Sequence, residues 1–78
     1  NDKKYPVCIR ICQKLLAKDS WREDCHRRLM RCYSILGQRN LALRQYDICV
    51  QALDRELEVQ PTSETTNLYR KIRSGEAV

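Results

Sequence analysis

Five cysteines and one histidine are the side chains of this 78-residue chain best suited to chemistry. Cys8 and Cys12 lie four residues apart, and Cys25 and Cys32 lie seven apart, so each pair falls on one face of a helix. Thiols spaced along one helix are poorly placed for a disulfide framework, and on an apolar stripe they are usually small core residues. We therefore interpret them as buried thiols of a protein in a reducing cytoplasm.

Catalysis and metal binding find little support in the same residues. A zinc site favours CxxC pairs or a cluster of histidines, whereas His26 stands alone and is expected to fill a helix interface. Cys25 and His26 point about 100° apart on a helix, so they do not form a nucleophile–base pair. No Gly-rich phosphate loop or carboxylate pair stands out. We expect no enzyme, no cofactor and no metal, with a thiol-based metal or redox sensor at Cys8 and Cys12 as an alternative.

Basic side chains are the second chemical feature of the chain. Fifteen Lys and Arg residues against ten acids give a formal net charge of +5. The candidate interaction surface consists of Arg10, Lys14, Lys18, Trp21, Arg27, Arg28 and Arg31. Trp21 is either a binding aromatic or a residue that packs on the neighbouring helix. Because acidic residues are interleaved, we favour a solvated face or contact with an acidic protein, and keep direct nucleic-acid binding as an alternative.

Four amphipathic helices are predicted to position these side chains. Apolar residues recur at spacings of three and four, strand-forming runs are absent, and Gly and Pro number two each. The predicted helices cover Lys4–Lys18, Trp21–Leu36, Arg39 (or Asn40) to Leu57, and Ser63–Arg73. No apolar run approaches the roughly 18 residues of a membrane span.

The helix ends carry local signals. Ser20 with Glu23 three residues later fits a capping box at the start of the second helix. Gly37 fits the position after the helix end, where a left-handed backbone is least costly for glycine. Thr62 or Ser63 is expected to cap the fourth helix.

The segment from His26 to Pro61 has the pattern of one helix–turn–helix repeat. A tetratricopeptide repeat follows W-x2-L-G-x2-Y, then A-x3-F, then P, with a period of roughly 34 residues. The structural repeat positions here are Leu29, Tyr33, Gly37, Ala42, Leu43, Tyr46, Cys49, Leu53, Leu57 and Pro61. The proline comes about two turns late, so the third helix is longer than usual. We expect an all-α, tetratricopeptide-like right-handed superhelix of about four antiparallel helices.

The longer third helix and its exit carry a closer resemblance. The motifs are Asp19-x-Trp21-x-Glu23, His26-Arg27-x-Leu29-Met30, Gly37-x-Arg39-x2-Ala42-Leu43-x2-Tyr46, and Leu53-x2-Glu56-Leu57-x-Val59-x-Pro61-x2-Glu64-Thr65-x2-Leu68. With these in order over about Tyr5 to Ile72, the chain resembles the bacterial transcriptional activator domain. This helical module follows the winged-helix DNA-binding domain in antibiotic regulatory protein-type activators. The chain departs from the family at Ser20, usually Pro, and at Glu58, usually Gly.

The resemblance implies a regulatory or oligomerisation module of a bacterial transcription activator. We expect residues 1–78 to form a single domain, a fragment of a larger regulator whose DNA-binding domain is absent from this chain. The expected partners are a sister protomer, another domain of the same regulator, or transcription machinery. DNA would be contacted only through the absent domain, and no membrane is expected. A stand-alone tetratricopeptide scaffold is a further alternative.

Overall fold

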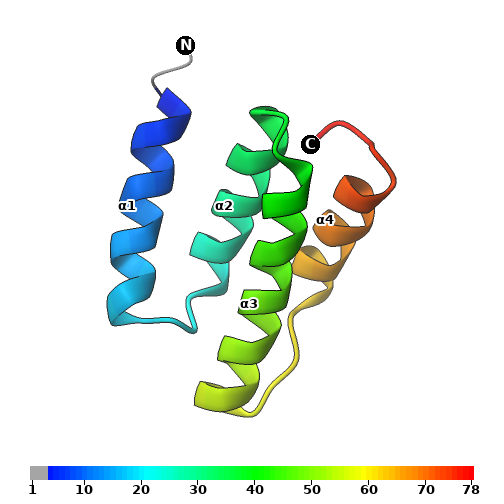
Figure 1. Cartoon of the computed structure of the whole chain (residues 1–78). Helices are drawn as coiled ribbons and strands as arrows, with labels where there is room; N and C mark the ends of the chain where they lie inside the picture. The colour runs from blue at the N-terminus through cyan, green and yellow to red at the C-terminus, as the bar shows by residue number, and fades with distance from the viewer. Residues whose placement is uncertain (1–3) are drawn as a thin grey trace.

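The computed structural model describes residues 4–78, which form four helices joined by short connections (Figure 1). The helices are α1 (Lys4–Lys18), α2 (Glu23–Ile35), α3 (Arg39–Leu57) and α4 (Ser63–Arg73). No strand occurs in the described residues, so the predicted all-α class is confirmed. The predicted bounds of α1, α3 and α4 are also confirmed, whereas α2 begins two residues later than expected and ends one residue earlier.

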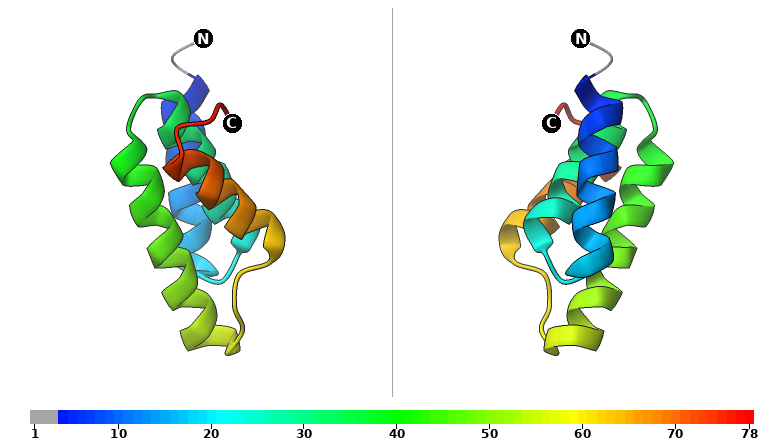
Figure 2. Two further views of the ribbon diagram at one scale, coloured as in Figure 1. Left: turned by 90° about the vertical axis from the view of Figure 1, so that its right-hand side faces the viewer. Right: turned by 90° about the vertical axis from the view of Figure 1, so that its left-hand side faces the viewer.

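Helix α2 is the centre of the arrangement. It packs against α1 on one side and against α3 on the other, and α4 lies against both α2 and α3. Helix α1 packs on α2 alone among the described helices. Figure 2 shows α1 and α4 on opposite sides of the molecule, with α4 inclined to α3. The fold is therefore a short stack of helices, each covering its neighbours, as in a helical repeat.

Two small apolar clusters lie on the two sides of α2. Toward α1, Cys25 and Leu29 pack with Cys12. Toward α3 and α4, Met30 is fully buried among further apolar side chains. The second cluster contains Met30, Ala42, Leu68 and Ile72. Tyr33 contacts both clusters, so one aromatic ring joins the two halves of the core.

The turn after α2 is built around Gly37, as predicted. Gly37 has φ +78°, and its N–H donates to the Ser34 carbonyl at 3.0 Å. The N–H of Gln38 donates to the Tyr33 carbonyl at 2.8 Å. These two bonds form a Schellman motif, which satisfies carbonyls that the end of the helix leaves unpaired.

The predicted capping box at Ser20 and Glu23 is wrong. Arg22, not Ser20, is the residue before α2, and no side chain caps this helix end. The Ser20 carbonyl accepts a hydrogen bond from His26, and the Glu23 carboxylate turns toward α4. Trp21 consequently lies in the turn before α2 and is 42% exposed, so it does not pack as a buried residue on the neighbouring helix.

The last turn of α3 is more exposed than predicted. Leu57 is one of the predicted structural repeat positions, but it is 48% exposed, and Val59 is similarly exposed. The reason is the length of α3, whose end extends past the neighbouring helices (Figure 1). An apolar residue on this final turn has no helix opposite it.

Glu58 ends α3 in a conformation that favours glycine. Its φ of 54° and ψ of 40° are left-handed, which costs a residue with a Cβ roughly 1–2 kcal/mol. We expect Glu58→Gly to raise the free energy of unfolding by about 0.5–1 kcal/mol, after allowing for the greater entropy of glycine in the unfolded chain. Urea unfolding followed by circular dichroism measures the change. The matched control Glu56→Gly lies inside the helix and should lower stability by about 1 kcal/mol. A loss of stability in both variants would contradict the expectation.

Candidate functional site

The single histidine has a structural environment. His26 is 1% exposed, and its Nε2 lies 2.8 Å from the Ser20 carbonyl, which can only accept a hydrogen bond. Nε2 therefore carries the proton, and Nδ1 accepts a hydrogen bond from Gln45 Nε2 at 2.8 Å. Burial lowers the pKa of His26 despite the Ser20 bond and the nearby carboxylates. This neutral ring joins the α1–α2 turn to α3.

A polar network joins α2 to α4. Glu23 Oε2 accepts hydrogen bonds from the backbone N–H of Thr62 at 2.7 Å, from the Thr62 hydroxyl at 2.8 Å, and from the Thr65 hydroxyl. Arg27 Nη1 donates to Thr65 Oγ1 at 2.9 Å, and Arg27 Nη2 lies 3.3 Å from Glu64. We call these five residues the α2–α4 network. The network fixes the position of α4 on the central helix.

The thiols lie at the α1–α2 interface or, for Cys49, within α3. Burial raises the pKa of Cys12 and Cys49 to about 12 and that of Cys32 to about 11. Thiols with such pKa values are almost fully protonated near neutral pH and are poor nucleophiles. No cluster of three or more His, Cys, Asp or Glu side chains within residues 4–78 is arranged to hold a metal ion. Burial therefore disfavours Cys12 as a reactive thiol.

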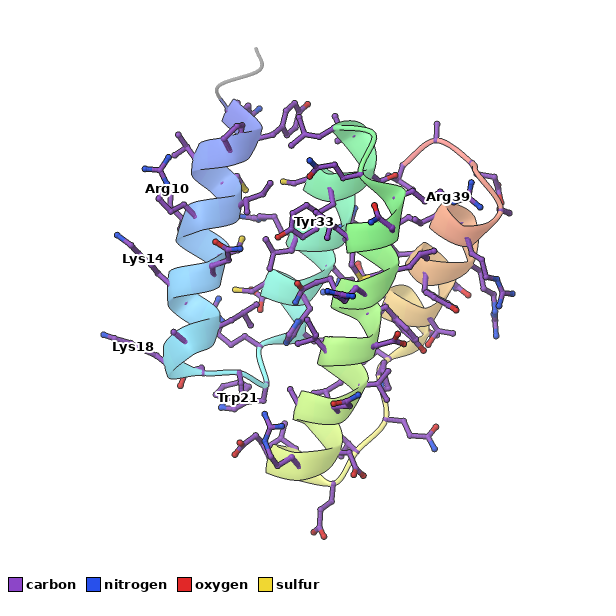
Figure 3. The ribbon with its side chains drawn as sticks, in the orientation of Figure 1. Arg10, Lys14, Lys18, Trp21, Tyr33 and Arg39 are labelled. Carbon is purple, nitrogen blue, oxygen red and sulfur yellow. The ribbon has the colours of Figure 1, made fainter. Side chains whose placement is uncertain are left out.

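The predicted basic surface is divided by the fold. Arg10, Lys14 and Lys18 are exposed on α1 and point away from the bundle (Figure 3). Arg28 and Arg31 are exposed on α2. Trp21 lies below the end of α1 in Figure 3. The seven residues therefore do not form one continuous patch.

Arg27 does not belong to a free surface. Its side chain is 16% exposed and is held by Glu23, Glu64 and Thr65. Sequence reasoning placed Arg27 on the candidate interaction surface and missed that α4 covers this position. The prediction that Arg27 belongs to the exposed interaction surface is therefore corrected. Arg27 is a positioning residue between α2 and α4.

A groove lies between α1 and α2 on the side away from α3. Its volume is about 220 Å³, and its α1 wall carries Val7, Ile11 and Leu15. These side chains are 50%, 53% and 37% exposed. Charged residues of α2 and the preceding turn, Arg22, Asp24 and Arg28, line the other wall. We call this site the α1–α2 groove. Sequence reasoning did not single out Val7 or Leu15 as exposed.

A second apolar groove lies on the opposite side, between α1 and α3. It measures about 270 Å³, and Leu16, Ile48 and Ala52 contribute to its walls, with His26 at its base. Ile48 is 46% exposed. The described residues thus present apolar surface on two sides of the molecule, between α1 and α2 and between α1 and α3.

One of three comparisons with known proteins finds a match. A family model described as "Bacterial transcriptional activator domain" matches residues 4–73 of the chain. No curated protein and no solved structure matches the chain. No helix in residues 4–78 is both long enough and apolar enough to cross a membrane.

Proposed function

Because the chain belongs to the bacterial transcriptional activator domain family, we propose that it is a non-catalytic protein-interaction module of a cytoplasmic transcription activator. The module presents apolar helix surface to a sister protomer, to another domain of the same regulator, or to transcription machinery. DNA is contacted through a domain outside this chain. The single observation that supports this proposal best is the exposure of large apolar side chains on regular helices.

These exposed side chains come from most of the fold. They include Val7 and Ile11 of α1, Ile35 of α2, Ile48 and Leu57 of α3, and each is between 46% and 53% exposed. Burying apolar surface yields about 25 cal/mol per Å² and is the main favourable contribution to protein association. A stack of helices with uncovered apolar faces gains stability when another protein covers them.

Self-association is the expected result for the isolated chain. Light scattering of the reduced chain should give an average mass that rises above the monomer mass of 9.3 kDa as concentration increases from about 10 μM to 1 mM. The reducing agent prevents disulfide-linked dimers, which would mimic association. A mass of 9.3 kDa at every concentration would count heavily against the oligomerisation role.

Nucleic-acid binding is kept as a second candidate because of the α1 cations. Arg10, Lys14 and Lys18 are spaced four residues apart, and none has an acidic partner within 4.0 Å in the part of the chain that the structure describes. Such a row could contact successive phosphates. Titration of a DNA duplex at low salt separates the two candidates, since phosphate contacts give an affinity that falls steeply with added salt. The absence of salt-dependent binding would remove this candidate.

A further inference from the structure

We propose that Cys8 is a redox-reactive thiol, which exchanges with a low-molecular-weight disulfide and then forms a disulfide with Cys32 that joins α1 to α2. This inference goes beyond the proposed interaction function and does not depend on it. It is carried by the gathering of four thiols at one interface, by the partial exposure of Cys8, and by the helix geometry that favours Cys32 as its partner.

Four of the five cysteines gather where α1 packs on α2. Cys12 and Cys25 belong to one buried cluster, and Cys8 packs against it. The Cys8 side chain is hydrogen-bonded to those of Cys12 and Cys32, so it contacts one thiol of its own helix and one of the facing helix. Sulfur atoms accordingly lie in the space between α1 and α2 in Figure 3. Thiols that already touch across two helices need little movement to be linked.

Cys8 is the thiol of this group that an external oxidant reaches first. It is partly exposed and lines the α1–α2 groove, whereas Cys12 and Cys32 are only 2% and 5% exposed. Burial raises the pKa of Cys12 to about 12 and that of Cys32 to about 11. Because the thiolate is the attacking species, neither buried thiol supplies the first nucleophile near neutral pH.

The charges along the α1–α2 groove favour an anionic oxidant. The lining contains three cations, Lys4, Arg22 and Arg28, and one acid, Asp24, which is paired with Arg22 at 2.9 Å. The charge of Arg28 opposes the rise in the pKa of Cys12 and of Cys32, so its guanidinium lies near the thiols. A small disulfide that carries carboxylates, such as oxidised glutathione, is attracted to this site.

Helix geometry selects Cys32 rather than Cys12 as the second thiol. Residues four apart on a helix have Cβ atoms about 5–6 Å apart, whereas a disulfide needs about 3.5–4.5 Å. Cys8 and Cys12 both lie inside α1, so a bond between them would distort the helix. Cys32 belongs to α2 and is free of this constraint. Sequence reasoning considered only pairs within one helix and therefore missed this pair.

The reaction consists of two thiol–disulfide exchanges. Cys8 loses its proton to water, and its Sγ attacks one sulfur of the small disulfide, whose S–S bond breaks to release a thiolate that takes up a proton. Cys32 then loses its proton to water, its Sγ attacks Cys8 Sγ, and the mixed disulfide breaks to release the second small thiol. Two protein thiols are oxidised, and one small disulfide is reduced to two thiols. The high pKa of Cys32 makes the second exchange the slower one.

The disulfide fastens α1 to the rest of the fold. Among the described helices α1 packs on α2 alone, so a bond between Cys8 and Cys32 holds the helix that has the fewest neighbours. It closes a loop of about 25 residues and thereby restricts the unfolded chain. An excess of small thiols opens the bond again by the reverse exchange, which makes the modification reversible in a reducing compartment.

Oxidised glutathione is the probe that tests the proposal. The reduced chain is incubated with it at pH 8, quenched with acid, and analysed by intact mass spectrometry and peptide mapping. The wild type should lose about 2 Da, and the map should link Cys8 to Cys32. Cys32→Ala should stop at the mixed disulfide, a gain of about 305 Da, and Cys8→Ala should form neither product. The Tm of the oxidised wild type should be about 5–15 °C above that of the reduced chain.

Cys49→Ala is the matched control, because Cys49 is a buried thiol of α3 outside the cluster. This variant and Cys12→Ala should both form the disulfide as the wild type does. A wild type that stays reduced or stops at the mixed disulfide would overturn the proposal. So would a disulfide that maps to another pair, or one that still forms in Cys8→Ala. If the buried variant Cys32→Ala fails to fold, the wild-type map and Cys8→Ala, at a partly exposed position, still decide.

Discussion

Replacing Glu23 by glutamine is expected to lower the free energy of unfolding at pH 7 by about 2–3 kcal/mol, the cost of losing charge-assisted hydrogen bonds in a partly buried site. One oxygen of Glu23 accepts three hydrogen bonds from Thr62 and Thr65, and Arg27 lies 3.7 Å away. The neutral amide of glutamine would form weaker hydrogen bonds with Thr62 and Thr65. It would also leave the positive charge of Arg27 without the nearby negative charge of Glu23. Because the three bonds connect helices that are distant in the sequence, α4 should loosen first.

The effect of Glu23→Gln should depend on pH in a defined direction. Burial raises the pKa of Glu23, but the hydrogen bonds from Thr65 and Thr62 and the charge of Arg27 outweigh it and hold the pKa below its usual value. A carboxylate whose folded pKa is depressed stabilises the fold above the unfolded pKa of about 4.3 and loses that contribution as pH falls through the folded pKa.

Urea unfolding of the wild type and Glu23→Gln at pH 7 and near pH 2.5 measures both effects. The difference between the two proteins should be large at pH 7 and small in acid. Glu64→Gln is the matched control: its side chain is 65% exposed and makes one ion pair with Arg27, so it should cost less than about 0.5 kcal/mol. A cost for Glu23→Gln as small as that expected for Glu64→Gln would show that the hydrogen bonds of Glu23 do not hold α4.

His26→Phe is expected to lower the free energy of unfolding by about 2 kcal/mol, and the added change Gln45→Leu should recover most of that loss. Phenylalanine has a similar volume but leaves the buried Gln45 amide and the Ser20 carbonyl without their partner. Replacing both His26 and Gln45 by apolar groups removes one of these unpaired groups. A double-mutant cycle from urea unfolding measures the coupling between the two residues. Additive losses would contradict the hydrogen bond between them.

The buried pair of His26 and Gln45 should also make the protein less stable in mild acid. Burial lowers the pKa of His26, against the opposing effects of the Ser20 carbonyl and the carboxylates of Glu23 and Asp24. The unfolded state therefore binds a proton more readily, and stability falls as pH drops from about 6.5 toward the folded pKa. Protonation also places a hydrogen on Nδ1 where Gln45 donates. The double variant should lack this slope between pH 7 and about 5.5.

Much of the fold follows from local sequence patterns. Three- and four-residue apolar spacing predicts α1, α3 and α4 correctly, and Gly37 marks the turn because its positive φ suits glycine. The start of α2 was mispredicted because Ser20 and Glu23 fit a capping box when only neighbouring residues are considered. Glu23 instead bonds to Thr65, 42 residues away, and only the packing of α4 on α2 creates that option.

The candidate site was less predictable than the helices. Exposed cations such as Lys14 follow from the polar face of α1, but the burial of Arg27 depends on where α4 lies. Apolar periodicity also gave no reason to separate Ile9, which packs on the cluster toward α2, from Ile11, which lines a groove. Which side of a broad apolar face is covered depends on the neighbouring helices, so the groove becomes visible only in three dimensions.

Calorimetric dilution of the concentrated, reduced chain at several temperatures tests most directly whether apolar helix surface drives association. The predicted result is a measurable heat of dissociation. Its enthalpy should increase with temperature, which corresponds to a positive heat-capacity change. The heat should persist at about 0.5 M salt, because salt does not screen apolar contacts. Dilution heats equal to the buffer blank at every temperature, or heats that disappear with salt and carry no heat-capacity change, would contradict it.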